Sequence, residues 1–181
     1  MDTKQLTRLS KFLSLHLRHR PEGLGLTLQE GGWVPVAELL AACAAHGTAI
    51  SPAALTEIVE GNDKQRFAFD ASGTRIRAQQ GHSVEVDLQL PPATPPAVLY
   101  HGTAPSALPA IRQSGLQKMK RHHVHLSPDE ETARRVGARR GQPIILTVDA
   151  AAMHAAGVVF YKSGNGVWLV DAVPPHYLGG L

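Results

Sequence analysis

The chain has 181 residues, of which 43% are hydrophobic, so one core of ordinary quality or two smaller ones can be buried. Its formal net charge of +3 is compatible with nucleic-acid binding without being diagnostic of it. No segment approaches the roughly 20 consecutive apolar residues of a membrane helix, and the first thirteen residues carry charges where a signal peptide is apolar. Cys43 is the only cysteine. We therefore expect a cytoplasmic protein without disulfides.

Three helices and a hairpin are predicted in the first half of the chain. Leucines at helical spacing predict an amphipathic helix over residues 3–18. Two more helices are predicted, one that starts at about Pro35 and is closed by Gly47, and one over residues 52–60 with Ser51 as its N-cap and Gly61 beyond its end. Residues 66–78 then alternate as two short strands around a glycine-containing turn. This order is that of a winged helix, a fold common in nucleic-acid binding, although many such domains only mediate protein contacts.

A proline-rich stretch divides the chain. Residues 83–90 alternate between apolar and polar and predict one more strand. Residues 91–97 contain four prolines, which exclude a central strand or a helix interior. We therefore predict an N-terminal lobe over 1–90, a stiff linker over 91–97 and a C-terminal lobe over 98–181.

The C-terminal lobe is predicted to be a small α+β unit. Its sequence indicates strands at 97–102, 123–127, 143–149, 158–161 and 166–170, with helices at 105–114 and 129–138 between them.

Histidines and a glycine at the predicted strands are the first candidates for a ligand site. His101 and Thr103 can form hydrogen bonds with a ligand, and Gly102 lets backbone approach one closely, although the tripeptide could equally be a turn with incidental polar residues. His123 and His125 share one face of a strand, but two histidines without a nearby thiolate or carboxylate make a poor zinc site. We expect no metal.

Basic residues form the second group of candidates. Lys64 and Arg66 lie two residues apart in a segment read as extended, which puts them on the same side. Arg18 and His19 end the first predicted helix, where cations are favourable in any case. Arg139 follows a predicted helix and lies between two glycines; arginine suits phosphate because its guanidinium donates two parallel hydrogen bonds. Each group could also be an ordinary solvated surface.

Eight short segments, taken together in their order along the chain, indicate a protein family more specifically than any single motif does. "LSKFLSLHLRHRPEGLGL", "GGWVPVAELL", "NDKQRFAF", "LYHGT", "HVHLS", "VGARRGQP", "FYKSGNGVWL" and "VPPHYL" together resemble the Tpt1/KptA family of RNA 2′-phosphotransferases, over residues 5–178. The resemblance implies a winged-helix lobe followed by a lobe of ADP-ribosyltransferase fold.

The resemblance also implies an activity. Enzymes of that family remove an internal 2′-phosphate from RNA with NAD⁺ as co-substrate and without a metal. The phosphate displaces nicotinamide, which gives an ADP-ribosylated RNA 2′-phosphate. The neighbouring ribose hydroxyl then attacks the phosphorus and releases 2′-OH RNA and ADP-ribose 1″,2″-cyclic phosphate. The expected partners are therefore NAD⁺ and a tRNA-like RNA with a 2′-phosphate, bound by a monomer.

Residue by residue, the resemblance implies two groups. The family's catalytic set matches Arg18, His19, Arg66 and Arg139, and Lys64 joins Arg18 and Arg66 in binding the RNA phosphate. The NAD-binding positions match His101, Gly102, Thr103, His125, Ser127 and Arg139. Arg140 departs from the family pattern, in which many members have histidine after the catalytic arginine.

Two other readings stay open at this point. The same first step would serve an ADP-ribosyltransferase that caps terminal phosphates of RNA or DNA. A winged-helix DNA regulator that senses NAD is the other, but the predicted helix at 52–60 has two acidic residues and no lysine or arginine, which makes it a poor surface for the major groove.

Overall fold

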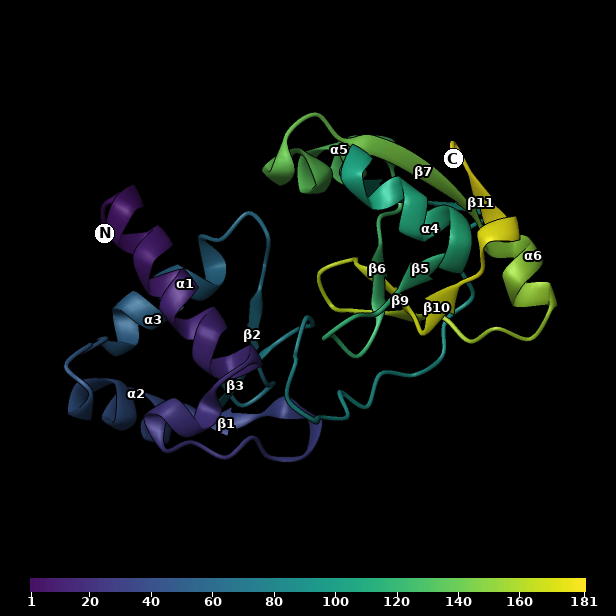
Figure 1. Ribbon diagram of the computed structural model, residues 1–181. Helices are drawn as coiled ribbons and strands as arrows, with labels where there is room; N and C mark the ends of the chain where they lie inside the picture. Colours follow the sequence, from purple (N-terminus) through teal and green to yellow (C-terminus); the bar gives the residue numbers. More distant parts are fainter. The chain divides into compact units, whose positions relative to one another are not determined.

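The structure is a computed structural model that describes residues 1–181, with the side chain of Arg140 excepted. Contacts divide the chain into two compact units, Met1–Gln89 and Leu90–Leu181, each with its own hydrophobic core. The chain contains six α-helices and small antiparallel sheets (Figure 1). Among the described residues, no helix combines the length and hydrophobicity needed to cross a membrane.

The first unit consists of three helices and a three-stranded sheet. Its elements are α1 (Thr3–Arg18), β1 (Val34–Pro35), α2 (Val36–Ala45), α3 (Pro52–Glu60), β2 (Phe67–Phe69) and β3 (Arg75–Ala78). The three predicted helices and the hairpin are confirmed. Local signals explain their ends: Ser51 accepts a hydrogen bond from Ala54 N at the start of α3, and Asp2 accepts one from Gln5 N at the start of α1.

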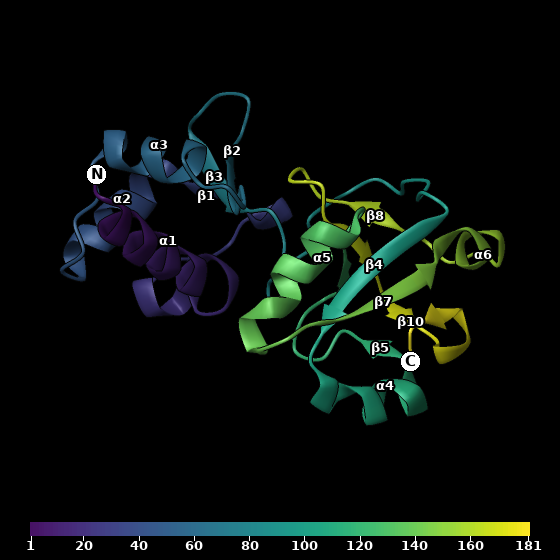
Figure 2. The same ribbon diagram turned by 90° about the horizontal axis from the view of Figure 1, so that it is seen from above.

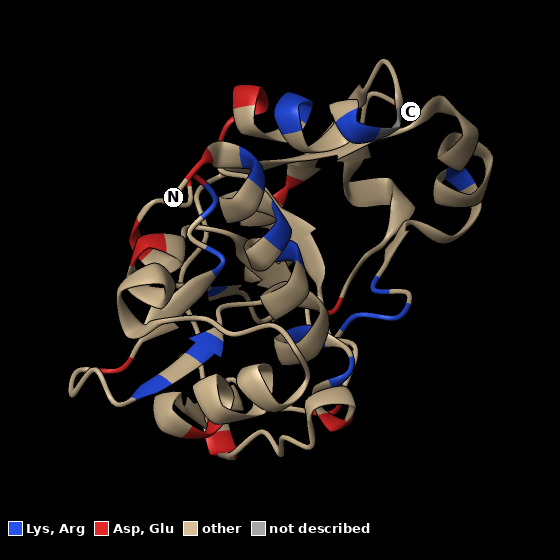
Figure 3. Cartoon of the chain, turned by 90° about the vertical axis from the view of Figure 1, so that its left-hand side faces the viewer, with Lys and Arg blue, Asp and Glu red and all other residues tan. Residues whose placement is uncertain are grey.

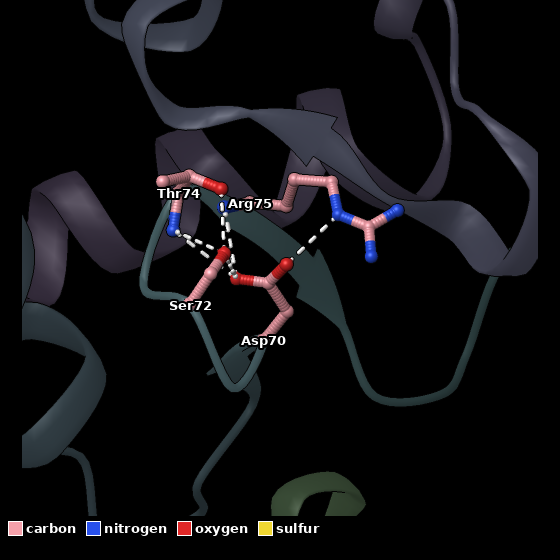
Figure 4. Close-up of polar contacts among 4 residues, drawn as sticks. All are labelled: Asp70, Ser72, Thr74 and Arg75. Carbon is pink, nitrogen blue, oxygen red and sulfur yellow. Dashed lines mark hydrogen bonds and ion pairs between the residues drawn. The ribbon is translucent and has the colours of Figure 1, made fainter.

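A compact polar turn closes the hairpin of β2 and β3. Figure 4 shows how one carboxylate organises it: Asp70 Oδ1 accepts from Ser72 Oγ and from the backbone of Thr74 and Arg75, while Oδ2 accepts from Arg75 Nε. The hydrogen bond from the Arg75 side chain is the main reason why the pKa of Asp70 falls from 3.8 to about 2. The turn therefore fixes the register of the strand β3 that leads toward the candidate site.

The strand predicted at residues 83–90 is wrong. Alternating exposure is present, but the segment pairs with no strand. The amides of Ser83 and Val84 instead donate to the Arg18 carbonyl at the end of α1, and Val86 and Leu88 pack near Gly32. The last carbonyls of a helix lack intrahelical donors, so this segment caps α1 in preference to extending the sheet.

The second unit combines three helices with short strands. Its elements are β4 (Val98–Thr103), α4 (Leu108–Ser114), β5 (Leu116–Gln117), β6 (Val124–Leu126), α5 (Glu130–Gly137), β7 (Ile144–Asp149), α6 (Ala150–Ala155), β8 (Tyr161–Lys162), β9 (Trp168–Val170), β10 (Ala172–Val173) and β11 (Leu178–Gly179). Both predicted helices and the strands predicted at 97–102, 123–127, 143–149 and 166–170 are present with shifted ends. Of the strand predicted at 158–161 only Tyr161 lies in a strand, β8. Helix α6 and the two-residue strands β5, β10 and β11 were not predicted.

Strand β4 belongs to one sheet of the second unit and connects it with another. The sheet β11-β7-β4 contains the long pairing of β4 with β7, and the sheet β6-β9-β8 is joined to it where Tyr100 and Ser127 exchange backbone hydrogen bonds. Helix α5 packs on β4 and β7 (Figure 2). The proline-rich segment is docked on this unit, since Ala93 N donates to the Phe160 carbonyl and Pro92 pairs with Tyr161.

Candidate functional site

Lysine and arginine, blue in Figure 3, occur on helices, strands and loops and are interspersed with acidic residues. The distribution of lysine and arginine along the chain therefore does not identify a site. What distinguishes the predicted residues is the set of contacts that hold them, and these form one group in each unit.

In the first unit, the end of α1 carries Arg18 and His19. Arg18 is the last helical residue, and its guanidinium lies against Gly81, whose added Cβ would be 3.6 Å from Arg18 Cζ. His19 Nδ1 lies 2.8 Å from Ser83 Oγ. A serine hydroxyl can donate or accept, so Ser83 can hold the imidazole in its neutral or its protonated form.

Arg66 contacts the same segment through its backbone. The Arg66 carbonyl accepts from Gln79 N, and the Gln79 side-chain amide donates to the Gln65 carbonyl. Gln79 is two residues before Gly81 and four before Ser83. The segment 79–83 therefore connects Arg66 with Arg18 and His19. These two residues precede Arg66 by more than 40 positions in the sequence.

Asn62 fixes the loop that carries Lys64 and Arg66. Its Oδ1 accepts from Lys64 N at 3.0 Å and from Arg66 Nη1 at 3.3 Å, and its Nδ2 donates to Ser10 Oγ at 3.0 Å. Ser10 lies two helical turns before Arg18, on the same face of α1. One amide side chain thus ties both basic residues to the helix that carries the other two.

The extended reading of residues 64–66 is wrong. Gln65 N donates to the Asn62 carbonyl, and Gln65 has φ +41, so the segment is a turn. Lys64 lies in this turn and is exposed, whereas Arg66 is half-buried. Side chains two residues apart point to the same side in a strand because successive side chains alternate, and this alternation does not apply in a turn.

In the second unit, His101 on β4 has a defined tautomer. Its Nδ1 lies 3.0 Å from the His125 carbonyl, which can only accept, so Nδ1 carries the hydrogen. Burial lowers the pKa of His101 below its ordinary 6.5, an effect that the hydrogen bond to His125 only partly opposes. The ring is therefore neutral at pH 7, and Nε2 offers a lone pair to a ligand hydroxyl.

Gly102 has a packing role that the sequence did not indicate. A Cβ on Gly102 would lie 1.9 Å from the Ala133 carbonyl oxygen and 3.0 Å from Gly137 N, both on α5. The absence of a side chain lets α5 rest directly on β4. Arg139 follows two residues after Gly137, in a short helical turn that contacts β4, and its side chain is exposed.

The other predicted residues of this unit lie on β4 or on the segment paired with it. Thr103 ends β4 opposite Ile144, while Ser127 pairs with Tyr100 directly before His101. His125 on β6 accepts from His101 through its carbonyl, and its ring Nδ1 lies 3.4 Å from Arg121 Nη1. The structure thus brings together His101, Gly102, Thr103, His125, Ser127 and the Arg139 segment within one unit. No group of three potential metal ligands occurs among the described side chains.

Sequence reasoning missed Asn62, Gln79 and Ser83, which hold the predicted cations. Asn62 was inside a quoted segment, and its position two residues before Lys64 is typical of an asparagine that organises a turn. Gln79 and Ser83 gave no such signal, because their partners are distant in sequence.

Comparisons with known proteins agree on one family. The family model "RNA 2'-phosphotransferase, Tpt1 / KptA family" matches residues 4–172. A "Probable RNA 2'-phosphotransferase" of Streptomyces griseus is 60% identical, with 98% of this chain and 98% of the relative covered. Proteins of the same description are 61% identical in Trichormus variabilis, with 98% of both chains covered, and 54% identical in Burkholderia pseudomallei, with 95% and 94% covered.

Proposed function

The chain belongs to the Tpt1/KptA family of RNA 2′-phosphotransferases, and from this premise we propose that it transfers an internal RNA 2′-phosphate to NAD⁺. The observation that carries the proposal is that the Arg18 and His19 side chains lie against the segment 79–83, which is hydrogen-bonded to the backbone of Arg66. The most distinctive feature of a phosphate ester is its negative charge, and arginines that surrounding contacts hold in place recognise this charge.

The first unit binds the RNA phosphate in this proposal. Arg18 and Arg66 donate to its oxygens through guanidinium groups that neighbouring residues hold in place. His19, supported by Ser83, donates through Nε2. The exposed Lys64 adds a further positive charge. The predicted winged-helix character of this unit is part of the same proposal.

The second unit binds NAD⁺ in this proposal, with the ADP-ribosyltransferase fold that the family resemblance implies. The side chains fit a dinucleotide: His101 Nε2 is an acceptor for a ribose hydroxyl, because Nδ1 is committed to the His125 carbonyl. Thr103, two residues after His101 on β4, and Ser127, paired with Tyr100, carry hydroxyl groups that the family resemblance assigns to the same cofactor. Arg139 is an exposed cation at the end of α5, suited to a phosphate of the dinucleotide or of the RNA.

The two chemical steps ask different things of the cations. In the first, the RNA phosphate oxygen bonds to the anomeric carbon and the bond to nicotinamide breaks, so cations position a nucleophile that is already anionic. In the second, the ribose hydroxyl attacks the phosphorus, and the bond to the RNA 2′-oxygen breaks. Negative charge then accumulates on a five-coordinate phosphorus, which fixed cations stabilise directly. Neither step needs a nucleophile from the protein.

The deciding experiment uses an RNA with one internal 2′-phosphate, incubated with and without NAD⁺, with all products identified by mass. We expect 2′-OH RNA, nicotinamide and ADP-ribose cyclic phosphate in equal amounts, also in the presence of a chelator. Turnover without NAD⁺ would refute the proposal. A stable ADP-ribosylated RNA or DNA terminus as the main product would instead identify an enzyme that caps terminal phosphates.

Single-turnover kinetics of Lys64→Ala and Arg139→Ala test the division between the steps. Both variants should accumulate RNA that carries ADP-ribose on its 2′-phosphate, since the second step depends more on cations. Arg139→Lys should restore little, because an ammonium group cannot replace a two-pronged guanidinium contact. Loss of both steps in equal proportion, with no intermediate at any time, would show that the division is wrong.

A further inference from the structure

The loop between β5 and β6 is a basic surface that the proposed chemistry does not use. Lys118, Lys120 and Arg121 are exposed within four residues, and the half-buried His122 and His123 follow. The chain has no acidic residue between Asp87 and Asp129. Lys118 Nζ lies 2.8 Å from Asp171 Oδ1. The loop therefore presents a positive surface to solvent.

An apolar side chain stands in the middle of this charge. Met119 is 86% exposed and has φ +55, a conformation that non-glycine residues adopt at a cost. Folding alone gives no reason to hold a methionine in solvent in a strained conformation, and such backbone outliers gather at functional sites. A flexible thioether beside cations can lie against the face of an unpaired base.

The loop is anchored to the strand that carries His125. The rings of His123 and Tyr161 lie 5.6 Å apart, and Arg121 Nη1 lies 3.4 Å from His125 Nδ1. Because His125 also accepts from His101, the basic loop adjoins the proposed NAD-binding residues within the same unit. A strand bound along the loop would lie next to the proposed NAD-binding residues of this unit.

We propose that the loop of Lys118, Met119 and Lys120 binds the RNA strand that flanks the 2′-phosphate, with the lysines on backbone phosphates and the methionine on a base. This inference rests on the proposed function and names the part of the substrate that the loop recognises. The loop does not bind the 2′-phosphate itself, so its contribution depends on the length of the RNA.

The test compares a 2′-phosphorylated dinucleotide with a single-stranded RNA of about twelve nucleotides that carries the same 2′-phosphate. Lys118→Ala/Lys120→Ala should raise KM for the longer RNA several-fold and leave kcat unchanged. KM for the dinucleotide and KM for NAD⁺ should not change. Arg112→Ala/Arg134→Ala, which removes two exposed cations from helices α4 and α5 of the same unit, is the matched control and should behave as wild type.

Salt dependence gives a second readout that does not require turnover. Each phosphate contact to single-stranded nucleic acid contributes about 0.7 to the slope of log affinity against log salt. The double variant should lower this slope by about 1.4 in a binding titration with the unmodified twelve-nucleotide RNA, and the control should not.

The outcomes separate this inference from the proposed function. Equal effects on both substrates, a raised KM for NAD⁺, or an unchanged salt slope would overturn the role of the loop. Absence of turnover by the wild type on both RNAs would instead refute the proposed function, while the binding titration would still decide whether the loop contacts RNA.

Discussion

The side-chain oxygen of Asn62 accepts a hydrogen bond from the Arg66 guanidinium at a distance of 3.3 Å. The same oxygen accepts from the Lys64 amide, and the side-chain nitrogen donates to Ser10 on α1. An uncharged amide can hold an arginine in place without neutralising it. Asn62 is therefore suited to position cations whose charge has to remain available for a phosphate.

Asn62→Ala should lower kcat/KM for 2′-phosphorylated RNA about tenfold, the value of one hydrogen bond to a charged group. The unfolding midpoint should change little, because the side chain is only half-buried. Asn62→Asp keeps the acceptor but adds a negative charge beside Arg66, so it should impair activity at least as strongly. Activity of Asn62→Asp equal to wild type would show that the charge of Arg66 is not needed.

Arg18 and Arg20 offer an internal comparison at the end of α1. Arg18 lies against Gly81, whereas Arg20 is exposed beyond the helix. If cations only favour the helix end, Arg18→Ala costs at most about 1 kcal/mol of stability and little activity. We expect Arg18→Ala and His19→Ala to lower the rate by orders of magnitude with nearly unchanged melting temperature, and Arg20→Ala to be mild. Small and equal effects at all three would favour the helix-end explanation.

His101 should make both stability and NAD⁺ use sensitive to acid. Burial lowers the pKa of the folded imidazole below 6.5, so the unfolded chain takes up a proton first. This contribution to stability is complete above about pH 6.5 and is lost as pH falls from there to the lowered pKa. KM for NAD⁺ should rise over the same acid range, because a protonated Nε2 cannot accept.

The control for this prediction is His101→Gln, which lacks the titrating ring. Denaturant midpoints and KM for NAD⁺, measured between pH 5 and 8, should lose the His101-dependent part of their pH profile in this variant. Identical profiles for the wild type and His101→Gln would contradict the assignment.

Gly102→Ala should destabilise the second unit through a backbone clash. The new Cβ would lie 1.9 Å from the Ala133 carbonyl oxygen, which forces α5 away from β4. Overpacking of this kind costs about 1–3 kcal/mol, measurable as a lower urea midpoint. Gly23→Ala, where the Cβ would meet side-chain atoms of His16 at 3.4 Å and of Arg20 at 4.0 Å, is the control. A stable, inactive Gly102→Ala would point to a ligand contact as the main role of this glycine.

Asp70→Asn should destabilise the first unit in a pH-dependent way. The pKa of Asp70 is lowered to about 2 in the folded protein, mainly by its hydrogen bond from Arg75. The stabilisation is therefore complete above the unfolded pKa of 3.8 and is lost as pH falls toward 2. The difference in unfolding free energy between wild type and variant should be constant above about pH 5 and shrink below pH 4. A constant difference down to pH 2 would contradict the role of the charge.

Elements whose signals are local could be predicted from the sequence. Helix α3 begins at the proline after Ser51 and ends before Gly61, and β4, β6 and β7 follow their apolar runs. Capping hydrogen bonds and side-chain periodicity involve residues within four positions of each other, so they can be read from the printed letters. The family resemblance, too, rested on short segments in order.

The contacts among the candidate residues depend on long-range packing and could not be predicted from the sequence. The alternation of residues 83–90 predicted a strand, but the amides of Ser83 and Val84 instead donate to the Arg18 carbonyl at the end of α1. The roles of Gly102, as the place where α5 rests on β4, and of Asn62, as the link to α1, depend on partners far away in the chain. Pattern fixes which residues can form an element, whereas unsatisfied polar groups and close packing between distant segments decide which side chains that element brings together.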